Sequence, residues 1–382
     1  MQADTPVRWA EIDTGALAHN TRLIRSRIEP TTQLMAMVKS NGYGHGSEIA
    51  ARASLGGGAT WLGVYTPDEA LALRATGLDV PTLVVGWSPP ATHATLIERD
   101  IDVTVVDVAG IESVAREAGR LRRKARVHVK IDTGLGRLGV RAGDLNPVVA
   151  ALGSAGDQVT VVGMFTHFAD AESNPDFTLL QHQRFLEAVD ALRPVAPDAL
   201  LHTSGSAAII EFPELHHDLV RLGISLYGYL PHGIESDLEL RPAMSVFAQV
   251  AQVKTVDTGE TLGYGRTWRA DERRRVATVA IGYGQGVRRA LSNHGHMVVN
   301  GRRCPIAGIV SMDQVTLDVT DVGDVATGDT AMFFGEWDGV RLGADEVAEQ
   351  TGTIAYEVLC GVAASVPRVA VRRSIESGTV GP

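Results

Sequence analysis

The sequence has little of what marks a secreted, metal-binding or membrane-spanning protein. Its two cysteines, Cys304 and Cys360, lie far apart without CxxC spacing, which argues against a structural zinc site and a disulfide framework. We expect both cysteines to be core residues. No apolar run approaches the roughly 20 residues that span a bilayer, and residues 1–11 lack the basic and apolar segments of a secretory signal. A cytoplasmic protein without membrane contact is therefore expected.

The chain also lacks a surplus of positive charge. Its 45 acidic residues outnumber its 35 lysines and arginines, which gives a net charge of −10. Nucleic acids and anionic membranes require a basic footprint on the proteins that bind them, so small molecules are the expected ligands. The length of 382 residues is enough for two domains of roughly 100–200 residues each.

The first part of the chain alternates apolar, β-branched runs with helical stretches rich in Ala, Leu, Glu and Arg. Strands that alternate with helices favour parallel βα units, and eight such units close a TIM-type barrel. We therefore predict an α/β fold in which residues 1–242 hold an N-terminal segment and a (β/α)8 barrel. The predicted barrel strands are Leu34–Val38, Thr60–Val64, Thr82–Val85, Asp102–Val106, Arg126–Ile131, Thr160–Phe165, Ala199–Thr203 and Leu219–Tyr227.

After Pro242 the pattern changes to strands bounded by Gly, Asn and Asp, without long helical segments between them. Residues 243–382 are predicted to form a second, mostly β domain. The stretch Val7 to Asp13 could pair with this domain, which the sequence does not settle. The predicted strands are Val246–Val256, Arg275–Ile281, Met297–Val299, Arg303–Val310, Gln314–Val319 and Thr330–Phe334.

Lys39 follows the first predicted barrel strand and begins a glycine-rich loop. Parallel barrels carry their chemistry at the carboxyl ends of the strands, and a lysine desolvated there can form a Schiff base. The alternative is a surface lysine in a flexible loop. Other residues that follow the predicted strands would share this rim: Tyr43, Lys130, Arg137, His167, Ser206, Arg221 and Gly223.

The loops after the seventh and eighth strands of such barrels commonly bind phosphate. In this chain those loops supply Ser204, Gly205, Ser206 and the backbone of Gly223 and Ile224. A lysine beside a phosphate site suggests pyridoxal 5′-phosphate as the cofactor.

The segment Val38-Lys-Ser-Asn-Gly-Tyr-Gly-His-Gly46 resembles the pyridoxal phosphate signature of alanine racemases, enzymes of fold type III. Further segments resemble motifs of that family in the family's order, and together they extend over nearly the whole chain. They are Lys130–Gly139, Thr166–Ala169, Val220–Ile224, Gly263–Gly265, Gly282–Tyr283, Met312–Gln314 and Tyr356–Val358.

The resemblance implies a homodimeric, pyridoxal phosphate-dependent isomerase that interconverts L-alanine and D-alanine and supplies D-alanine for peptidoglycan. Lys39 would hold the cofactor and act as one acid/base, and Tyr264 of the facing subunit would act as the other. Stereoinversion needs two such groups on opposite faces of the substrate. The implied cofactor-binding residues are Lys39, Tyr43, His167, Ser206, Arg221, Gly223, Ile224 and Tyr356.

The resemblance also implies roles around the substrate. Arg137 would face the cofactor's phenolic oxygen or the substrate carboxylate, while Met312 and Tyr283 would line the entrance and pocket of the partner's site. The family's counterpart of Lys130 is often carbamylated, which would turn a cation into an anion able to orient Arg137. Arg221 would face the pyridine nitrogen.

Arg221 would hold the pyridine nitrogen unprotonated, because a guanidinium does not give up its proton. The cofactor ring is then a weaker electron sink, which limits transamination. A tyrosine hydroxyl ordinarily has a pKa of about 10 and needs help to act as a base near neutral pH. A hydrogen bond from His167 to Tyr264 is the candidate for that help.

Each residue also has a structural interpretation: a rim histidine for His167, a turn residue for Tyr264, a salt-bridged core arginine for Arg221, a surface lysine for Lys130 and simple packing for Met312. We interpret His45 and His202 as structural. Taken together at one predicted rim, the set favours function.

The chain departs from the family pattern at Gly205, where Asn is usual, at Gly42, and at Gly284-Gln285. These departures leave open a racemase of broader specificity for serine or basic amino acids on the same scaffold. A decarboxylase of related architecture would have an acidic group in place of Arg221. A single-domain pyridoxal phosphate carrier would lack the domain that holds Tyr264.

Overall fold

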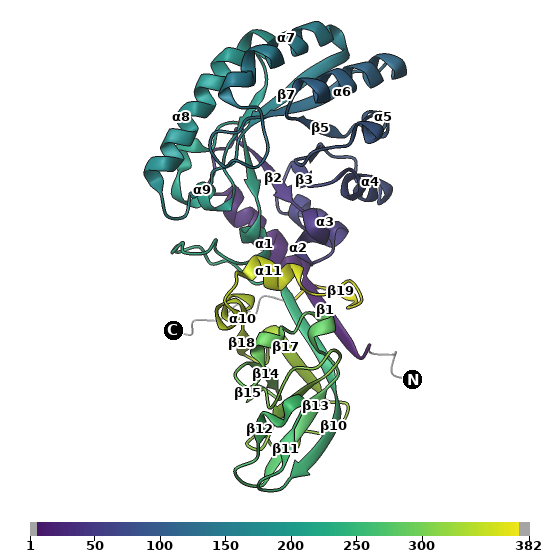
Figure 1. Ribbon diagram of the computed structural model, residues 1–382, viewed down its shortest axis with the longest axis vertical. Helices are drawn as coiled ribbons and strands as arrows, with labels where there is room; N and C mark the ends of the chain where they lie inside the picture. The colour runs from purple at the N-terminus through teal and green to yellow at the C-terminus, as the bar shows by residue number, and fades with distance from the viewer. Residues whose placement is uncertain (1–5, 374–382) are drawn as a thin grey trace, which may run out of the picture. The chain divides into compact units, whose positions relative to one another are not determined.

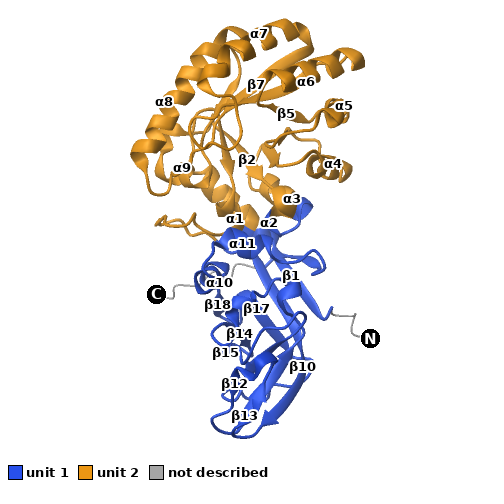
Figure 2. Ribbon diagram, in the orientation of Figure 1, with its two compact units in different colours: residues 1–16, 43–49, 241–382 blue, residues 17–42, 50–240 orange. Residues whose placement is uncertain are grey.

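The computed structural model describes residues 6–373, which divide into two compact units (Figure 2). The barrel unit comprises residues 17–42 and 50–240. The β unit comprises residues 6–16, the short segment 43–49 and residues 241–373. The predicted single division after residue 242 therefore differs from the observed units at two N-terminal segments.

The barrel unit contains eight parallel strands that nearly close on themselves. The end strands β8 and β9 are joined by hydrogen bonds from Asp218 N–H to Leu201 O (3.1 Å) and from Arg221 N–H to Ser204 O (2.9 Å). This confirms the predicted fold. Around the sheet the strands follow the order β8 (Leu200–His202), β7 (Val159–Phe165), β6 (Ala125–Lys130), β5 (Asp102–Val105), β4 (Thr82–Val84), β3 (Trp61–Val64), β2 (Gln33–Met37) and β9 (Leu219–Leu222).

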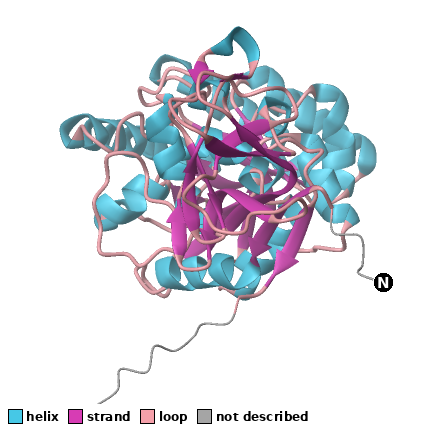
Figure 3. Ribbon diagram, turned by 90° about the horizontal axis from the view of Figure 1, so that it is seen from below, coloured by secondary structure: helices cyan, strands magenta, loops and turns pink. Residues whose placement is uncertain are grey.

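Helices lie outside the strands, as the end-on view shows (Figure 3). The sequence specifies several helix starts: Thr66 accepts from the N–H of Glu69, whose carboxylate accepts from the N–H of Thr66, and Pro67 occupies the first turn. The helices are α1 (Thr14–Arg25), α3 (Ser47–Gly56), α4 (Pro67–Ala75), α5 (His93–Glu98), α6 (Val108–Leu121), α7 (Leu145–Ala155), α8 (Pro175–Leu192) and α9 (Ser206–Glu211).

The last predicted barrel strand is too long. β9 ends at Leu222, and Ile224–Tyr227 forms a 3₁₀ helix. The break comes at Gly223, whose N–H donates to the hydroxyl of Ser206 (2.9 Å) and so leaves the ladder.

The β unit is built on a sheet in which the long strand β10 (Met244–Val256) pairs with three others (Figure 1). β1 (Arg8–Asp13) runs antiparallel to β10 and parallel to β19 (Arg368–Val371), which settles the partner of the N-terminal stretch. The remaining strands are β11 (Thr261–Leu262), β12 (Trp268–Arg269), β13 (Arg274–Val279), β14 (His296–Val299), β15 (Arg302–Pro305), β16 (Val315–Asp318), β17 (Thr330–Trp337) and β18 (Val340–Leu342), and helices α10 (Ala344–Thr351) and α11 (Ala355–Cys360) follow them.

The two cysteines, both expected in the core, differ in their exposure. Cys304 is buried as expected, but Cys360, the last residue of the short helix α11, is exposed. Within residues 6–373 no helix is long and apolar enough to cross a membrane.

Candidate active site

Lys39 begins α2 (Lys39–Tyr43), which follows β2 at the carboxyl end of the barrel. The turn is left-handed, since φ is 53° at Ser40, 53° at Asn41, 62° at Gly42 and 49° at Tyr43. Non-glycine residues adopt this conformation at a cost and retain it where the surroundings enforce it. A hydrogen bond from Ser40 N–H to Glu69 (2.6 Å) contributes.

The amine of Lys39 is half-buried and lies 5.9 Å from the centre of the Tyr65 ring. Tyr65 follows β3 and is itself 49% exposed. The lysine is therefore placed at the rim with an aromatic neighbour and access to solvent, as a group that reacts with a small molecule requires.

Lys130, at the end of β6, is buried with its amine 4.5 Å from the centre of the Phe165 ring. Burial, and then the charges of Arg221 and Arg137, lower the pKa of Lys130 to about 7. An amine with this pKa is partly neutral at physiological pH and therefore nucleophilic.

Arg137 is exposed on the loop that follows β6. Asp132 organises this loop, since its carboxylate accepts from the N–H groups of Gly134 (3.1 Å) and Gly136 (3.0 Å). The guanidinium of Arg137 is held near enough to lower the pKa of both Lys130 and His167.

Arg221 lies on β9, buried and surrounded by acceptors. It donates to the carbonyls of Thr166 (2.7 Å), His202 (2.7 Å) and Thr203 (2.8 Å), and to Nδ1 of His167 (3.3 Å). Burial lowers the pKa of Arg221 to about 9, which still leaves it charged at neutral pH. Its hydrogen-bond partners within residues 6–373 are carbonyl oxygens and histidine nitrogens rather than a carboxylate.

His167 follows β7 and is uncharged at neutral pH. Burial, and then the charge of Arg221, hold the pKa of His167 well below its ordinary value. Its neighbour Gly205 leaves room for the ring: a Cβ there would lie 3.3 Å from Cε1 of His167. The departure at residue 205 therefore widens the space beside this histidine.

Ser206 begins α9, directly after β8. Its hydroxyl lies 2.9 Å from the N–H of Gly223 and 3.5 Å from that of Ser225. The hydroxyl of Ser225 is buried and has no hydrogen-bond partner within residues 6–373. Hydroxyl and amide donors thus converge just beyond β8 and β9, next to Ile224, as anion-binding sites require.

Tyr43 and Tyr356 lie together in the β unit, with ring centres 6.1 Å apart. Tyr43 is buried, and burial, followed by the nearby Tyr356, raises the pKa of its hydroxyl. Tyr43 therefore keeps its proton at neutral pH, and its hydroxyl can donate a hydrogen bond.

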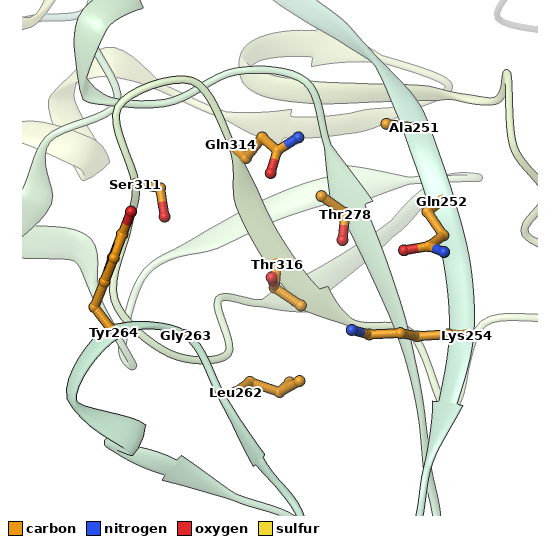
Figure 4. A pocket seen from close by; sticks show the side chains of 10 residues that line it. All are labelled: Ala251, Gln252, Lys254, Leu262, Gly263, Tyr264, Thr278, Ser311, Gln314 and Thr316. Carbon is orange, nitrogen blue, oxygen red and sulfur yellow. The ribbon is translucent and has the colours of Figure 1, made fainter.

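Three predicted site residues of the β unit are large and exposed: Tyr264 (71%), Met312 (57%) and Tyr283 (44%). A backbone hydrogen bond joins the loops that carry Tyr283 and Met312, since Tyr283 N–H donates to Ser311 O (3.0 Å). Tyr264 and Ser311 line one side of a hollow of about 740 Å³, opposite Gln252 (Figure 4).

The departure at Gly284-Gln285 has a structural counterpart. Gln285 is buried, and its side chain accepts from Gly282 N–H (3.0 Å) and donates to Asp313 (2.8 Å). It therefore joins the loop of Tyr283 to that of Met312.

The predicted residues fall into two groups. Lys39, Lys130, Arg137, His167, Ser206, Arg221, Gly223 and Ile224 belong to the barrel unit, and Tyr43, Tyr264, Tyr283, Met312 and Tyr356 to the β unit. No group of three or more His, Cys, Asp or Glu side chains that could hold a metal occurs in the described part of the chain.

Sequence reasoning missed two polar residues inside the barrel, Asp102 and His128. Asp102 is 1% exposed and His128 is 0% exposed, and they contact each other at 3.2 Å. His128 also contacts His202, which touches Arg221. The sequence does contain one sign of them: Arg126, His128 and Lys130 alternate, which places polar residues on one face of a buried strand.

Both parts of the chain match known families. Residues 12–231 match the alanine racemase N-terminal domain, and residues 243–370 match the alanine racemase C-terminal domain. The relative named Alanine racemase 2 from Oceanobacillus iheyensis is 38% identical over 96% of this chain and 94% of its own length. The alanine racemase of Desulfosudis oleivorans is 40% identical over 94% of this chain and 96% of its own length.

Solved structures agree with the sequence matches. Alanine racemase from D-cycloserine-producing Streptomyces lavendulae superimposes with a TM-score of 0.91 at 36% identity, covering 97% of this chain and 99% of that one. Alanine racemase from Bacillus anthracis with bound L-Ala-P gives a TM-score of 0.91 at 33% identity, covering 97% and 96%. Similarity that extends over both units at this level shows that the chain belongs to the alanine racemase family.

Proposed function

We propose that the protein interconverts L-alanine and D-alanine with pyridoxal 5′-phosphate as its cofactor, in a site completed by a second copy of the chain. One observation carries the proposal: the amine of Lys39 shares the barrel rim with the charged Arg221 and with the donors around Ser206. The amine suits the cofactor's aldehyde, the guanidinium suits its pyridine ring, and the donors around Ser206 suit its phosphate.

The donor set fits the phosphate. The hydroxyl of Ser206 and the N–H groups of Gly223 and Ser225 converge, and the buried hydroxyl of Ser225 lacks a partner within residues 6–373. By the family resemblance, Ile224, Tyr43 and Tyr356 are further proposed phosphate ligands. Hydroxyl and backbone N–H groups are hydrogen-bond donors, which favour an anion.

The reaction requires proton transfer at Cα of alanine. When bound, the cofactor supplies a conjugated ring that takes up the electron pair left by the departing proton. Lys39 holds the cofactor and moves the proton on one face of Cα. The partner subunit's Tyr264 moves it on the other face, and the return of a proton from the opposite side inverts the centre.

Arg221 is proposed to favour racemisation over transamination, and His167 to assist the partner's Tyr264. With the cofactor bound, the guanidinium of Arg221 would face the pyridine nitrogen and would leave it unprotonated, which would suppress transamination. His167 accepts from Arg221 at Nδ1, so its proton lies on Nε2, from which it donates to the partner's Tyr264.

The surface of the β unit supports the proposed homodimer. Tyr264, Tyr283 and Met312 expose large apolar side chains there, and large exposed apolar groups that gather together mark interaction sites. In a two-fold dimer this surface covers the partner's barrel mouth and excludes water from the reacting carbon.

Lys130 is proposed to carry a carbamate. Its neutral amine attacks carbon dioxide, a C–N bond forms, and one proton is released to solvent. The resulting anion lies among cations, since Arg221 and Arg137 both act on this lysine electrostatically. It would orient Arg137 toward the substrate carboxylate.

The relatives are named alanine racemases, so a broader specificity for serine or basic amino acids is not favoured. A supply of D-alanine to peptidoglycan and a cytoplasmic location stay predictions. The test is chiral chromatography of L-alanine incubated with protein and pyridoxal phosphate. Formation of D-alanine up to a racemic mixture supports the proposal, and its absence from a correctly folded, cofactor-loaded protein contradicts it.

A further inference from the structure

A chain of hydrogen bonds crosses the barrel interior from Asp102 to Arg221. Nη1 of Arg221 lies 3.0 Å from Nδ1 of His202. Nε2 of His202 lies 3.0 Å from Nδ1 of His128, and Nε2 of His128 lies 3.2 Å from Oδ2 of Asp102. Arg126 binds the same carboxylate at 2.7 and 3.1 Å.

The two ends of this chain fix its direction. A guanidinium only donates, so Nδ1 of His202 is an acceptor and its proton lies on Nε2. That nitrogen donates to Nδ1 of His128, whose proton must then lie on Nε2 and donate to Asp102. Burial raises the pKa of Asp102, but hydrogen bonds from His128 and Arg126 outweigh it and lower that pKa overall, so the carboxylate only accepts. Both ends require the same tautomers.

The rings are held in place by tight packing. His202 stacks on Phe165 at 4.7 Å, and His128 meets Trp61 edge to face at 5.6 Å. On β7, a Cβ at Gly163 would overlap Nδ1 of His128. The two histidines are fully buried, so neither ring can turn over to offer its other nitrogen without displacing these neighbours.

We propose that Asp102 is a positioning residue for Arg221: by accepting from His128 it fixes the tautomers of both histidines and keeps Nδ1 of His202 free to accept from the guanidinium. This deepens the proposed function and rests on it, since there Arg221 faces the cofactor's pyridine nitrogen. Asp102 acts from the amino-terminal end of β5 and touches neither cofactor nor substrate.

The tautomers can be observed directly in the wild-type protein. Neutron diffraction from a crystal of the full chain grown in D₂O shows which ring nitrogens carry deuterium. Deuterium on Nε2 of both His128 and His202, with none on Nδ1, supports the proposal. Deuterium on Nδ1 of either ring overturns it, whatever the enzymatic activity of the protein.

Substitutions test the consequence for the reaction. An amide in Asp102→Asn cannot satisfy His128 and Arg126 together, because either its NH₂ meets the Arg126 donors or it meets the Nε2–H of His128. We expect kcat for racemisation to fall about tenfold, by analogy with supporting residues at other sites. The KM for alanine should stay constant, and the ratio of pyruvate formation to racemisation should rise.

The double variant Asp102→Asn/Arg126→Met distinguishes the orientation of the acceptor oxygen at residue 102 from the loss of the carboxylate charge. Without the arginine, the amide oxygen can turn to His128, so kcat and the product ratio should return toward those of the Arg126→Met control. Failure of this rescue, or a single variant Asp102→Asn with wild-type kcat and product ratio, overturns the proposal. If the deuterium positions agree but wild-type protein does not racemise alanine, the proposed function fails and the hydrogen-bond chain stands.

Discussion

Arg221 donates a hydrogen bond from Nη2 to Nδ1 of His167 across 3.3 Å. Because the guanidinium cannot accept, this contact leaves the proton of His167 on Nε2. Nη2 shares its two N–H groups among His167 and the carbonyls of Thr166 and Thr203, while Nη1 donates to the carbonyl of His202. One arginine therefore fixes the tautomer of a rim histidine and holds three backbone carbonyls.

Replacing Arg221 by Glu should slow racemisation and increase transamination, because a carboxylic acid can protonate the pyridine nitrogen and strengthen the electron sink. Pyruvate released per alanine inverted is the measurement. The carbonyls left without donors each cost about 1–3 kcal/mol, so the ratio must be measured on protein shown to be folded by circular dichroism.

Arg221→Lys is the matched control for this change. It keeps a cation at the site but loses the fork of donors, so it should lower kcat without raising the product ratio. An Arg221→Glu enzyme with the wild-type ratio would assign the arginine a structural role alone.

Lys39 should carry the cofactor. Borohydride reduction of the holoprotein, followed by peptide mapping, should place one pyridoxyl group on the peptide that contains Lys39. Lys130, the other rim lysine, is the internal comparison in the same digest. A label on Lys130, or on neither lysine, would contradict the assignment.

Carbamylation of Lys130 should depend on pH in a defined direction. Its pKa is lowered to about 7, so the amine is protonated and unreactive below that pH and neutral above it. At constant dissolved ¹³CO₂, the carbamate signal in ¹³C NMR should grow as the pH rises from 6 to 8, as expected from that pKa. Lys130→Gln should lack the signal, and a signal that persists in this variant would assign the carbamate elsewhere.

Gly44 should tolerate alanine poorly, because φ is +84° and a Cβ would overlap the carbonyl of Leu359. Gly77 is the matched control, with φ of +80° and open space around it. Gly77→Ala should cost about 1–2 kcal/mol of unfolding free energy for the backbone alone, and Gly44→Ala roughly 1–3 kcal/mol more for the overlap. Urea denaturation measures both, and equal losses would refute the close approach.

The fold was largely predictable because barrel strands buried on both faces leave continuous apolar runs, such as Leu34–Val38, in the sequence. The end of the last barrel strand was predicted wrongly. β9 stops at Leu222 because the N–H of Gly223 donates to Ser206 instead of to a neighbouring strand. The partner of Val7–Asp13 was not predictable, since pairing of β1 with β10 joins residues more than 200 positions apart.

The rim residues of the candidate site could be proposed from the sequence because they follow or end predicted barrel strands, whereas Tyr264, Tyr283, Met312 and Tyr356 came from the family resemblance alone. Asp102 and His128 were missed because they lie within strands and acquire a role through contacts with His202 and Arg221 on other strands. His202, interpreted as structural, lies in the middle of that chain. Contacts across a barrel leave no spacing pattern in one sequence.

In the proposed dimer two chains build one site, and subunit exchange between two inactive variants tests this arrangement. Lys39→Ala and Tyr264→Phe homodimers should each be nearly inactive in racemisation, because each lacks one of the two proton-transfer groups. A mixed dimer holds one site with both defects and one with neither. After exchange verified by native mass spectrometry, alanine racemisation should return. Verified mixed dimers that stay inactive would contradict this arrangement.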